Sequence, residues 1–465
     1  MKNKALVLSV VLGLLAAGLV VVLNQGGYGP ASALRERRPG DDRAPGQGGT
    51  NALTAFEGRL IKGSGVPPAG FEGIWPGFRG ADLSNISKET QPLTRSWPAE
   101  GPPRLWKLDV GEGYAAAAIW KGRFYFTDYD HQNQADALRC HSLADGAELW
   151  RYTYPVRVKR NHGMSRTIPR VNGQLVVSLG PKCHLICLDA MTGELRWKMD
   201  LVERYNVEVP PWYAGQCPFV DGDRLILGTG GDALCVALDL ATGKEVWKSP
   251  NPNRWQMTHS SITPVEFRGR RMYVYCASGG VAGVDAVDGR ILWETPDWKI
   301  SMANIPAPLD IGDGRIFLCG GYNAGSMMLR LKEDAGRFQV ETLFRLKPTV
   351  FGATQQTPIL YKGHIIGVRP DGQMACLNLE GKPIWESGAA NKFGLGPFMI
   401  AQDLLLAMND DGLMTLAEAS IESFRKLAQA QVLQGHDAWG PMALADGRLI
   451  VRDMNQMICL DLRPR

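Results

Sequence analysis

The stretch "CLDAMTGELRW", Cys187–Trp197, joins the turn-forming residues Thr192 and Gly193 to a tryptophan four positions after the glycine. The same spacing recurs three more times along the chain. The other copies are "CHSLADGAELW" (Cys140–Trp150), "ALDLATGKEVW" (Ala237–Trp247) and "GVDAVDGRILW" (Gly283–Trp293). A piece that returns in this way indicates a repeated structural unit, because a catalytic site needs its residues only once.

The aromatic residues that end these units follow one another at intervals of between 41 and 51 residues. They are Trp106, Trp150, Trp197, Trp247, Trp293, Phe344 and Trp385. Eight segments read as strand, turn and strand, for example "QCPFVDGDRLIL" (Gln216–Leu227). A period of about 40–50 residues built from short strands is typical of propeller blades. We therefore predict an all-β fold, an eight-bladed β-propeller with four-stranded antiparallel blades.

The two ends of the repeat array are incomplete in a complementary way. The last unit stops at "ICLDLRPR" (Ile458–Arg465), before a fourth strand, while "PPRLWKLDV" (Pro102–Val110) precedes the first complete unit. We expect this N-terminal strand to complete the last blade, which closes the ring and removes an open sheet edge. The propeller is therefore assigned to residues 102–465. In the seventh unit, Glu418–Leu433 replaces the tryptophan motif, and its composition allows a short helix.

An uncharged apolar run of 19 residues, Ala5–Leu23, follows Lys2 and Lys4. It is long enough to span a bilayer, so residues 1–23 are predicted to form a single transmembrane or signal helix, a signal anchor or a signal peptide. Residues 24–73 are rich in Gly, Pro, Ala and Arg and are predicted to be a flexible tether. Residues 74–101 are predicted to be a lead-in segment that packs on the propeller. From these features we expect a protein of the cell envelope, anchored in the inner membrane, with an extracytoplasmic (periplasmic) propeller.

Charge and cysteine usage exclude several classes of protein. The formal net charge is +4, and basic residues are not interleaved with aromatic ones, which argues against binding of nucleic acid. None of the nine cysteines forms a C-x-x-C pair, so no metal site is predicted. Cys187, Cys376 and Cys459 occupy the same position of separate repeats, too far apart for disulfides, and we expect buried free thiols.

The recurring stretch resembles the tryptophan-docking motif A-x-D-x-x-T-G-x-x-x-W, which Ala237, Asp239, Thr242, Gly243 and Trp247 match in full. The chain therefore resembles the PQQ-like β-propeller repeat family, which includes quinoprotein alcohol dehydrogenases and the outer-membrane assembly protein BamB. Its front segment "WPGFRGADLSNIS" resembles the lead-in of such repeat proteins from planctomycete-type bacteria. The resemblance covers about residues 74–465 and implies the propeller fold.

The motif has a structural role that follows from its chemistry. An aspartate such as Asp189 can accept backbone N–H groups and fix the turn, and Gly193 supplies a positive φ at low cost. The tryptophan then lies on the outer strand, where its ring can pack between neighbouring blades. We assign this docking role to Trp106, Trp150, Trp197, Trp247, Trp293 and Trp385.

Candidate ligand residues lie in the loops that connect each outer strand to the next inner strand. In a propeller these loops share one face around the channel. Aromatic, amide and cationic side chains there suit a polar or anionic ligand or a protein partner; alternatively, they only seal the channel mouth. The candidates are Arg160, His162, Arg166, Trp212, Gln216, Trp255, His259, Asn304, Gln355 and Trp439.

The resemblance also implies a cofactor to be considered. Quinoprotein dehydrogenases hold PQQ under a disulfide of adjacent cysteines and use a bound Ca²⁺, but this sequence has no adjacent cysteines and no C-x-x-C-H haem motif. We therefore expect no cofactor, no metal and no catalytic residue, with PQQ and calcium as the alternative. The function predicted is a membrane-anchored, monomeric, non-catalytic scaffold that binds a protein partner in the envelope, in a BamB-like role. The alternative is a PQQ-dependent oxidoreductase.

Overall fold

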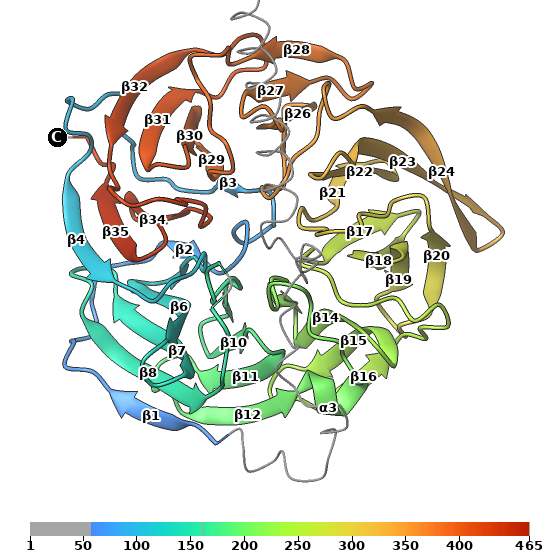
Figure 1. Ribbon diagram of the computed structural model, residues 1–465, viewed down its shortest axis with the longest axis horizontal. Coiled ribbons are helices and arrows are strands. Elements are labelled where there is room, and N and C mark those ends of the chain that lie inside the picture. Colours follow the sequence, from blue (N-terminus) through green and yellow to red (C-terminus); the bar gives the residue numbers. More distant parts are fainter. Residues whose placement is uncertain (1–56, 161, 465) are drawn as a thin grey trace, which may run out of the picture.

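Eight sheets form a closed ring in the computed structural model, which describes residues 57–160 and 162–464 (Figure 1). Four antiparallel strands make up each blade, from the centre of the ring outward. The predicted all-β, eight-bladed propeller is therefore confirmed. A short helix, α3 (Leu201–Tyr205), follows the outer strand of blade two, and Asp200 caps it by accepting the backbone N–H of Val202.

The blades are numbered along the chain, and their strands are given from the inside outward. Blades one to four contain β5 (Ala118–Trp120), β6 (Arg123–Asp130), β7 (Ala135–Ser142) and β8 (Glu148–Pro155); β9 (Arg170–Val171), β10 (Leu175–Leu179), β11 (His184–Asp189) and β12 (Leu195–Asp200); β13 (Phe219–Asp221), β14 (Arg224–Gly230), β15 (Ala233–Asp239) and β16 (Glu245–Lys248); and β17 (Thr263–Phe267), β18 (Arg270–Ala277), β19 (Gly280–Asp285) and β20 (Ile291–Thr295).

The remaining blades repeat this arrangement. Blades five to eight contain β21 (Leu309–Gly312), β22 (Arg315–Gly320), β23 (Gly325–Asp334) and β24 (Arg337–Leu346); β25 (Ile359–Tyr361), β26 (His364–Val368), β27 (Met374–Leu377) and β28 (Pro383–Glu386); β29 (Phe398–Ala401), β30 (Leu404–Met408), β31 (Leu413–Glu418) and β32 (Lys426–Gln431); and β33 (Ala443–Ala445), β34 (Arg448–Arg452), β35 (Gln456–Asp461) and β4 (Arg104–Asp109). In blade seven, the stretch Glu418–Leu433 contains the outer strand β32, and the helix that its composition allows is not formed.

The ring closes as the sequence predicts. Strand β4 pairs antiparallel with β35 and places Trp106 opposite Cys459, the same register that Trp197 and Cys187 have in blade two. The first strand of the repeat array and the last unit thus form one blade. Strand β4 gives the last blade its fourth strand, so the ring does not end in an incomplete sheet.

The segment before the propeller adds three short strands. Strand β1 (Arg59–Lys62) pairs with β8 on the outside of blade one, whereas β2 (Ile74–Trp75) pairs with β5 on its inside. Strand β3 (Ile86–Ser87) runs parallel to β29 of blade seven. Residues 59–62 were predicted as part of a flexible tether, and they instead form a strand. The sequence of these four residues, RLIK, is too short to show a period, and the pairing with β8 joins segments far apart in the chain.

The predicted anchor of residues 1–23 and most of the tether lie outside the described residues. Among the helices of the described part, none has the length and apolar character needed to cross a bilayer. The membrane anchor therefore stays a prediction.

The stretch that sets the period forms the turn between the third and fourth strands of a blade. In blade two, Asp189 Oδ1 accepts the backbone N–H groups of Met191 and Thr192, both at 2.9 Å. The N–H of Gly193 donates to the carbonyl of Asp189 at 2.9 Å, and Gly193 has a φ of 77°. The aspartate thus fixes the turn, and glycine takes the left-handed conformation that other residues adopt only with strain.

The tryptophan of one blade packs on this turn of the next blade. A Cβ atom on Gly193 would lie 2.6 Å from the ring of Trp150, and Gly243 has the same relation to Trp197. The six docking tryptophans are between 1% and 9% exposed. Four of their indole N–H groups donate to carbonyls of the neighbouring turn: Trp106 to Leu143, Trp197 to Leu240, Trp247 to Ala286 and Trp385 to Ser420. These contacts join the blades into a ring.

A comparison of Gly193→Ala with Gly222→Ala separates the docking contact from backbone strain. Gly222 also has a positive φ, but no atom lies within 4 Å of a Cβ added there. Both substitutions carry the backbone cost of about 1–2 kcal/mol for a left-handed residue. Gly193→Ala also pushes against Trp150 and Leu60, which adds about 1–3 kcal/mol. Chemical denaturation should show Gly193→Ala less stable than Gly222→Ala. Equal losses of stability would mean that the tryptophan packing does not couple the blades.

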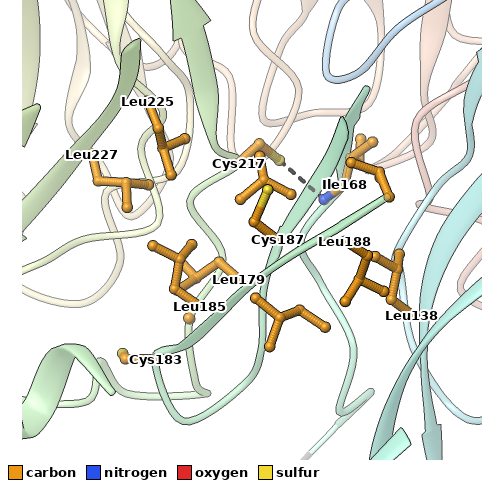
Figure 2. Close-up of a cluster of buried hydrophobic side chains, with 14 of the residues drawn as sticks. Leu138, Ile168, Leu179, Cys183, Leu185, Cys187, Leu188, Cys217, Leu225 and Leu227 are labelled. Carbon is orange, nitrogen blue, oxygen red and sulfur yellow. Dashed lines mark hydrogen bonds between the residues drawn. The ribbon is translucent and has the colours of Figure 1, made fainter. Parts of the chain in front are cut away.

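The nine cysteines are all buried and free, as predicted. Figure 2 shows three of them, Cys183, Cys187 and Cys217, among leucines of blades one to three, where the backbone N–H of Ile168 donates to the sulfur of Cys217 at 3.3 Å. Burial raises the pKa of Cys187 to about 12. A thiol with this pKa and no solvent access is unreactive near neutral pH.

Thiol titration checks this arrangement. In native protein near pH 8, an Ellman-type reagent should modify fewer than one thiol per chain within minutes, since thiolates are neither formed nor accessible. After unfolding in guanidinium without reductant, all nine should react. Fewer reactive thiols in the unfolded protein would reveal a disulfide and contradict the free-thiol assignment.

A buried arginine of the lead-in segment bonds to the chain directly before the inner strand β25 of blade six. Arg79 is 6% exposed and donates to the carbonyls of Leu83 at 2.7 Å, Thr357 at 2.7 Å and Pro358 at 2.9 Å. Asn85 donates to the carbonyl of Phe398 in blade seven at 2.6 Å. A single segment therefore ties blades six and seven to the front of the chain.

Candidate binding face

The two faces of the ring carry different connections. The connections between blades, together with the turns between second and third strands, form what we call the loop face. The docking turns and the turns between first and second strands form the turn face. The lead-in contacts the turn face: the backbone N–H of Gly73 donates to Asp446, the N–H of Gly447 to Glu89, and the N–H of Lys121 to the carbonyl of Gly73. The chain thus covers part of its own turn face.

A row of aromatic rings and one cation occupies the centre of the loop face. Trp439 donates its indole N–H to Asp410 Oδ1 at 2.7 Å and stacks on Tyr114, with ring centroids 5.2 Å apart. Tyr114 also contacts Arg166, whose guanidinium carbon lies 5.2 Å from the centre of the Tyr114 ring. The Nε of Arg166 donates to the carbonyl of Trp212 at 2.5 Å. Burial lowers the pKa of Arg166 to about 10, so the group stays cationic at neutral pH. Connections distant in sequence therefore share one cation–aromatic cluster.

The predicted residues His259 and Asn304 line the same cavity, of about 150 Å³. His259 is 9% exposed and Asn304 is 2% exposed. Burial, together with the charge of Arg166, lowers the pKa of His259 to about 3, so its imidazole is neutral at physiological pH. The two side chains come from consecutive inter-blade connections, which the order of blades brings side by side.

Gln355 lies at a second cavity, of about 240 Å³, which Asp410 also lines. The neighbouring Gln356 donates to the carbonyl of Trp439 at 3.0 Å and so joins this cavity to the central aromatic row. The row and the two cavities are the parts of the loop face where candidate residues come together.

Other predicted candidates have structural positions or lie apart. Gln216 is fully buried and bonds both the N–H and the carbonyl of Gly228 in its own blade. Trp255, 9% exposed, belongs to the hydrophobic core of blades three and four. His162 is exposed. Arg160 pairs with Glu112 at 2.7 Å and lines a cavity of about 890 Å³ beside β1, at the rim. Local sequence does not distinguish these cases, since all lie in similar polar loops.

Sequence reasoning missed Tyr114, Asp410 and Tyr322. Tyr114 lies in the connection from blade eight to blade one, which has no preceding complete repeat to mark it as a loop of this face. Asp410 and Tyr322 lie in turns between second and third strands, whose position on the loop face follows only from the blade topology. Tyr322 is 44% exposed.

The residues do not fit the PQQ and calcium arrangement that the resemblance implies. That arrangement needs a disulfide of adjacent cysteines over the cofactor, whereas the nine thiols here are free and buried within the strands and loops. Within residues 57–160 and 162–464, no three His, Cys, Asp or Glu side chains converge at one place.

The buried, neutral His259 predicts a specific dependence of stability on pH. Between about pH 6.5 and pH 3 the unfolded chain binds a proton at this imidazole and the folded protein does not, so stability falls on acidification through that window. The melting temperature of His259→Gln should fall less than that of wild type between about pH 7 and pH 4.5. His131→Gln, which removes an exposed imidazole, is the control and should follow wild type. Parallel curves for His259→Gln and wild type would show that His259 is protonated in the folded state.

Comparisons with known proteins agree with the architecture. The family model described as outer membrane protein assembly factor BamB matches residues 134–379. BamB from Moraxella catarrhalis is 14% identical with a TM-score of 0.52, and the alignment covers 77% of this chain and 100% of that one. The computationally designed Ika8 protein has 12% identity, the same TM-score and the same coverage. A quinohemoprotein alcohol dehydrogenase from Pseudomonas putida HK5 has 13% identity and a TM-score of 0.44, over 87% of this chain and 84% of that one. No curated protein sequence matches the chain.

Proposed function

We propose that this chain, which belongs to the family described as outer membrane protein assembly factor BamB, is a non-catalytic scaffold of the cell envelope that binds a protein partner through its loop face. Residues 1–23 anchor it in the inner membrane, and the propeller lies on the periplasmic side. The proposal rests on the difference between the residues that the two faces of the ring carry. Gly73 and Glu89 of the lead-in contact the turn face, and the loop face carries the clustered aromatic and amide side chains.

The chemistry of the loop face suits a protein partner. Tyr322 and Met302 are 44% and 49% exposed, and Trp212 is partly exposed beside the Arg166 guanidinium. Aromatic residues, Met and Arg are enriched at protein interfaces, where a few anchors supply most of the binding free energy. The two cavities offer places for such anchors from the partner.

Capture of the partner from native membranes tests the proposal. The full-length tagged protein is cross-linked in its own cells, purified in detergent, and its partners are quantified. Met302→Ala/Tyr322→Ala should reduce the captured partner about tenfold or more, since interface anchors contribute about 1–2 kcal/mol each. The control Val246→Ala/Val287→Ala removes side chains of similar exposure, 45% and 66%, from the outer edge and the docking turn, and should capture the wild-type amount.

Two results would contradict the proposal. One is a partner lost equally from both double variants, which would place the interface elsewhere. The other is dye reduction by the full-length protein after incubation with PQQ and Ca²⁺, which would make it an oxidoreductase.

A further inference from the structure

The cavity that contains His259 and Asn304 is built by three successive inter-blade connections. Glu208–Pro211 comes from the connection between blades two and three, Gln256–His259 from the next, and Ile300–Asn304 from the one after it. Ser278, in the turn between β18 and β19, completes the lining. The cavity is therefore a product of the ring, and each blade supplies one wall.

The side-chain amide of Asn304 is buried in this cavity without a partner. Neither its Nδ2 nor its Oδ1 has a hydrogen bond to the rest of the described protein, although the residue is only 2% exposed. Gln256 Oε1 is likewise buried and unbonded, while its Nε2 donates to the carbonyl of Arg254 at 3.2 Å, which fixes the orientation of this amide. Unsatisfied buried polar atoms are costly and rare in native proteins, so three beside one cavity indicate a ligand that bonds to them.

The set of unbonded atoms matches the hydrogen-bonding groups of a primary carboxamide. A primary carboxamide can accept from Asn304 Nδ2 through its carbonyl and donate its two N–H groups to Asn304 Oδ1 and Gln256 Oε1. A secondary amide has one N–H and leaves an acceptor unbonded. A carboxylate has no donor, and an ammonium has no acceptor.

The rest of the lining favours an uncharged, small occupant. His259 is neutral, and the one charged residue among those lining the cavity, Glu208, is exposed at its rim. Val209, Met257 and Ile300 supply buried apolar contacts for methylene groups. A volume of about 150 Å³ is below the roughly 300–1,000 Å³ of ordinary small-molecule sites and is suited to one side chain.

We propose that this cavity binds the primary carboxamide of a glutamine or asparagine side chain that the partner protein presents to the loop face. This inference rests on the proposed function for the origin of the side chain. The recognition of the carboxamide itself is a property of the cavity and can be measured without a partner.

The test uses propionamide, which carries the carboxamide on a short apolar chain, and ligand-observed NMR on the full-length protein in detergent. Propionamide should give saturation-transfer signals, while propionate and N-methylpropionamide at equal concentration should give signals at least about tenfold weaker, because each lacks a required hydrogen bond. Asn304→Leu should abolish the propionamide signal. Val246→Ala/Val287→Ala, which alters exposed side chains away from the loop face, is the control and should keep it.

A second readout separates recognition from folding. Asn304→Leu replaces an unbonded buried amide with an apolar side chain of similar size, so its melting temperature should equal or exceed that of wild type. A clear fall would show that Asn304 serves the fold, and would overturn the inference. Absence of a propionamide signal in wild type, or its persistence in Asn304→Leu, would overturn it too.

Partner capture then distinguishes this inference from the function on which it rests. If Asn304→Leu captures the partner as wild type does, the carboxamide site is wrong and the scaffold function stands. If the propionamide results are as expected and Asn304→Leu loses the partner while Val246→Ala/Val287→Ala retains it, both are supported. If propionamide binds and no partner is captured by wild type, the scaffold function and the assignment of the ligand to a partner are both wrong.

Discussion

The packing of one blade's tryptophan on the next blade's docking turn is the contact on which the rest of the structure depends. A single four-stranded blade cannot bury both of its faces, so its stability comes from its neighbours. Gly193 brings its turn within van der Waals contact of the Trp150 ring, and any side chain there would push the blades apart. Burial of an indole removes about 200 Å² from water, worth about 5 kcal/mol at most. The tryptophan of one blade and the glycine of the next blade thus form a single docking contact.

Ring closure converts this local device into a molecule with two different faces. Because the chain passes outward through each blade in the same direction, every docking turn lies on one face and every inter-blade connection on the other. Strand β4 closes the last blade, and Gly73 and Glu89 of the lead-in contact turns of the turn face. Residues of the loop face can change without disturbing the docking contacts. The blades therefore share the Gly and Trp of the docking motif but differ in sequence in loops such as Trp255–His259.

The same separation explains what could be predicted from the sequence. The period, the blade count and the closing strand depend on residues that every blade repeats, and these predictions are confirmed. Strand β1 escaped prediction because its pairing with β8 is neither local nor periodic. Among the loop residues, Gln216 turns inward to bond Gly228, whereas Asn304 lines a cavity. Both are amides in polar loops, and only the position of the neighbouring blades decides which one finds a partner within its own fold.

Asn304 and Gln216 also show how the free-energy cost of burying a polar group can indicate a functional residue in such a fold. Gln216 satisfies both of its amide atoms inside blade three, so its burial is stabilising and needs no further explanation. Asn304 is buried almost as deeply with both atoms unbonded, at a site where leucine would fit the apolar contacts of Met257 and Ile300. Burying a polar group without a hydrogen bond costs about 1–3 kcal/mol. A propeller stabilised by six docked tryptophans can tolerate that cost, and a ligand that bonds the amide recovers it as binding free energy.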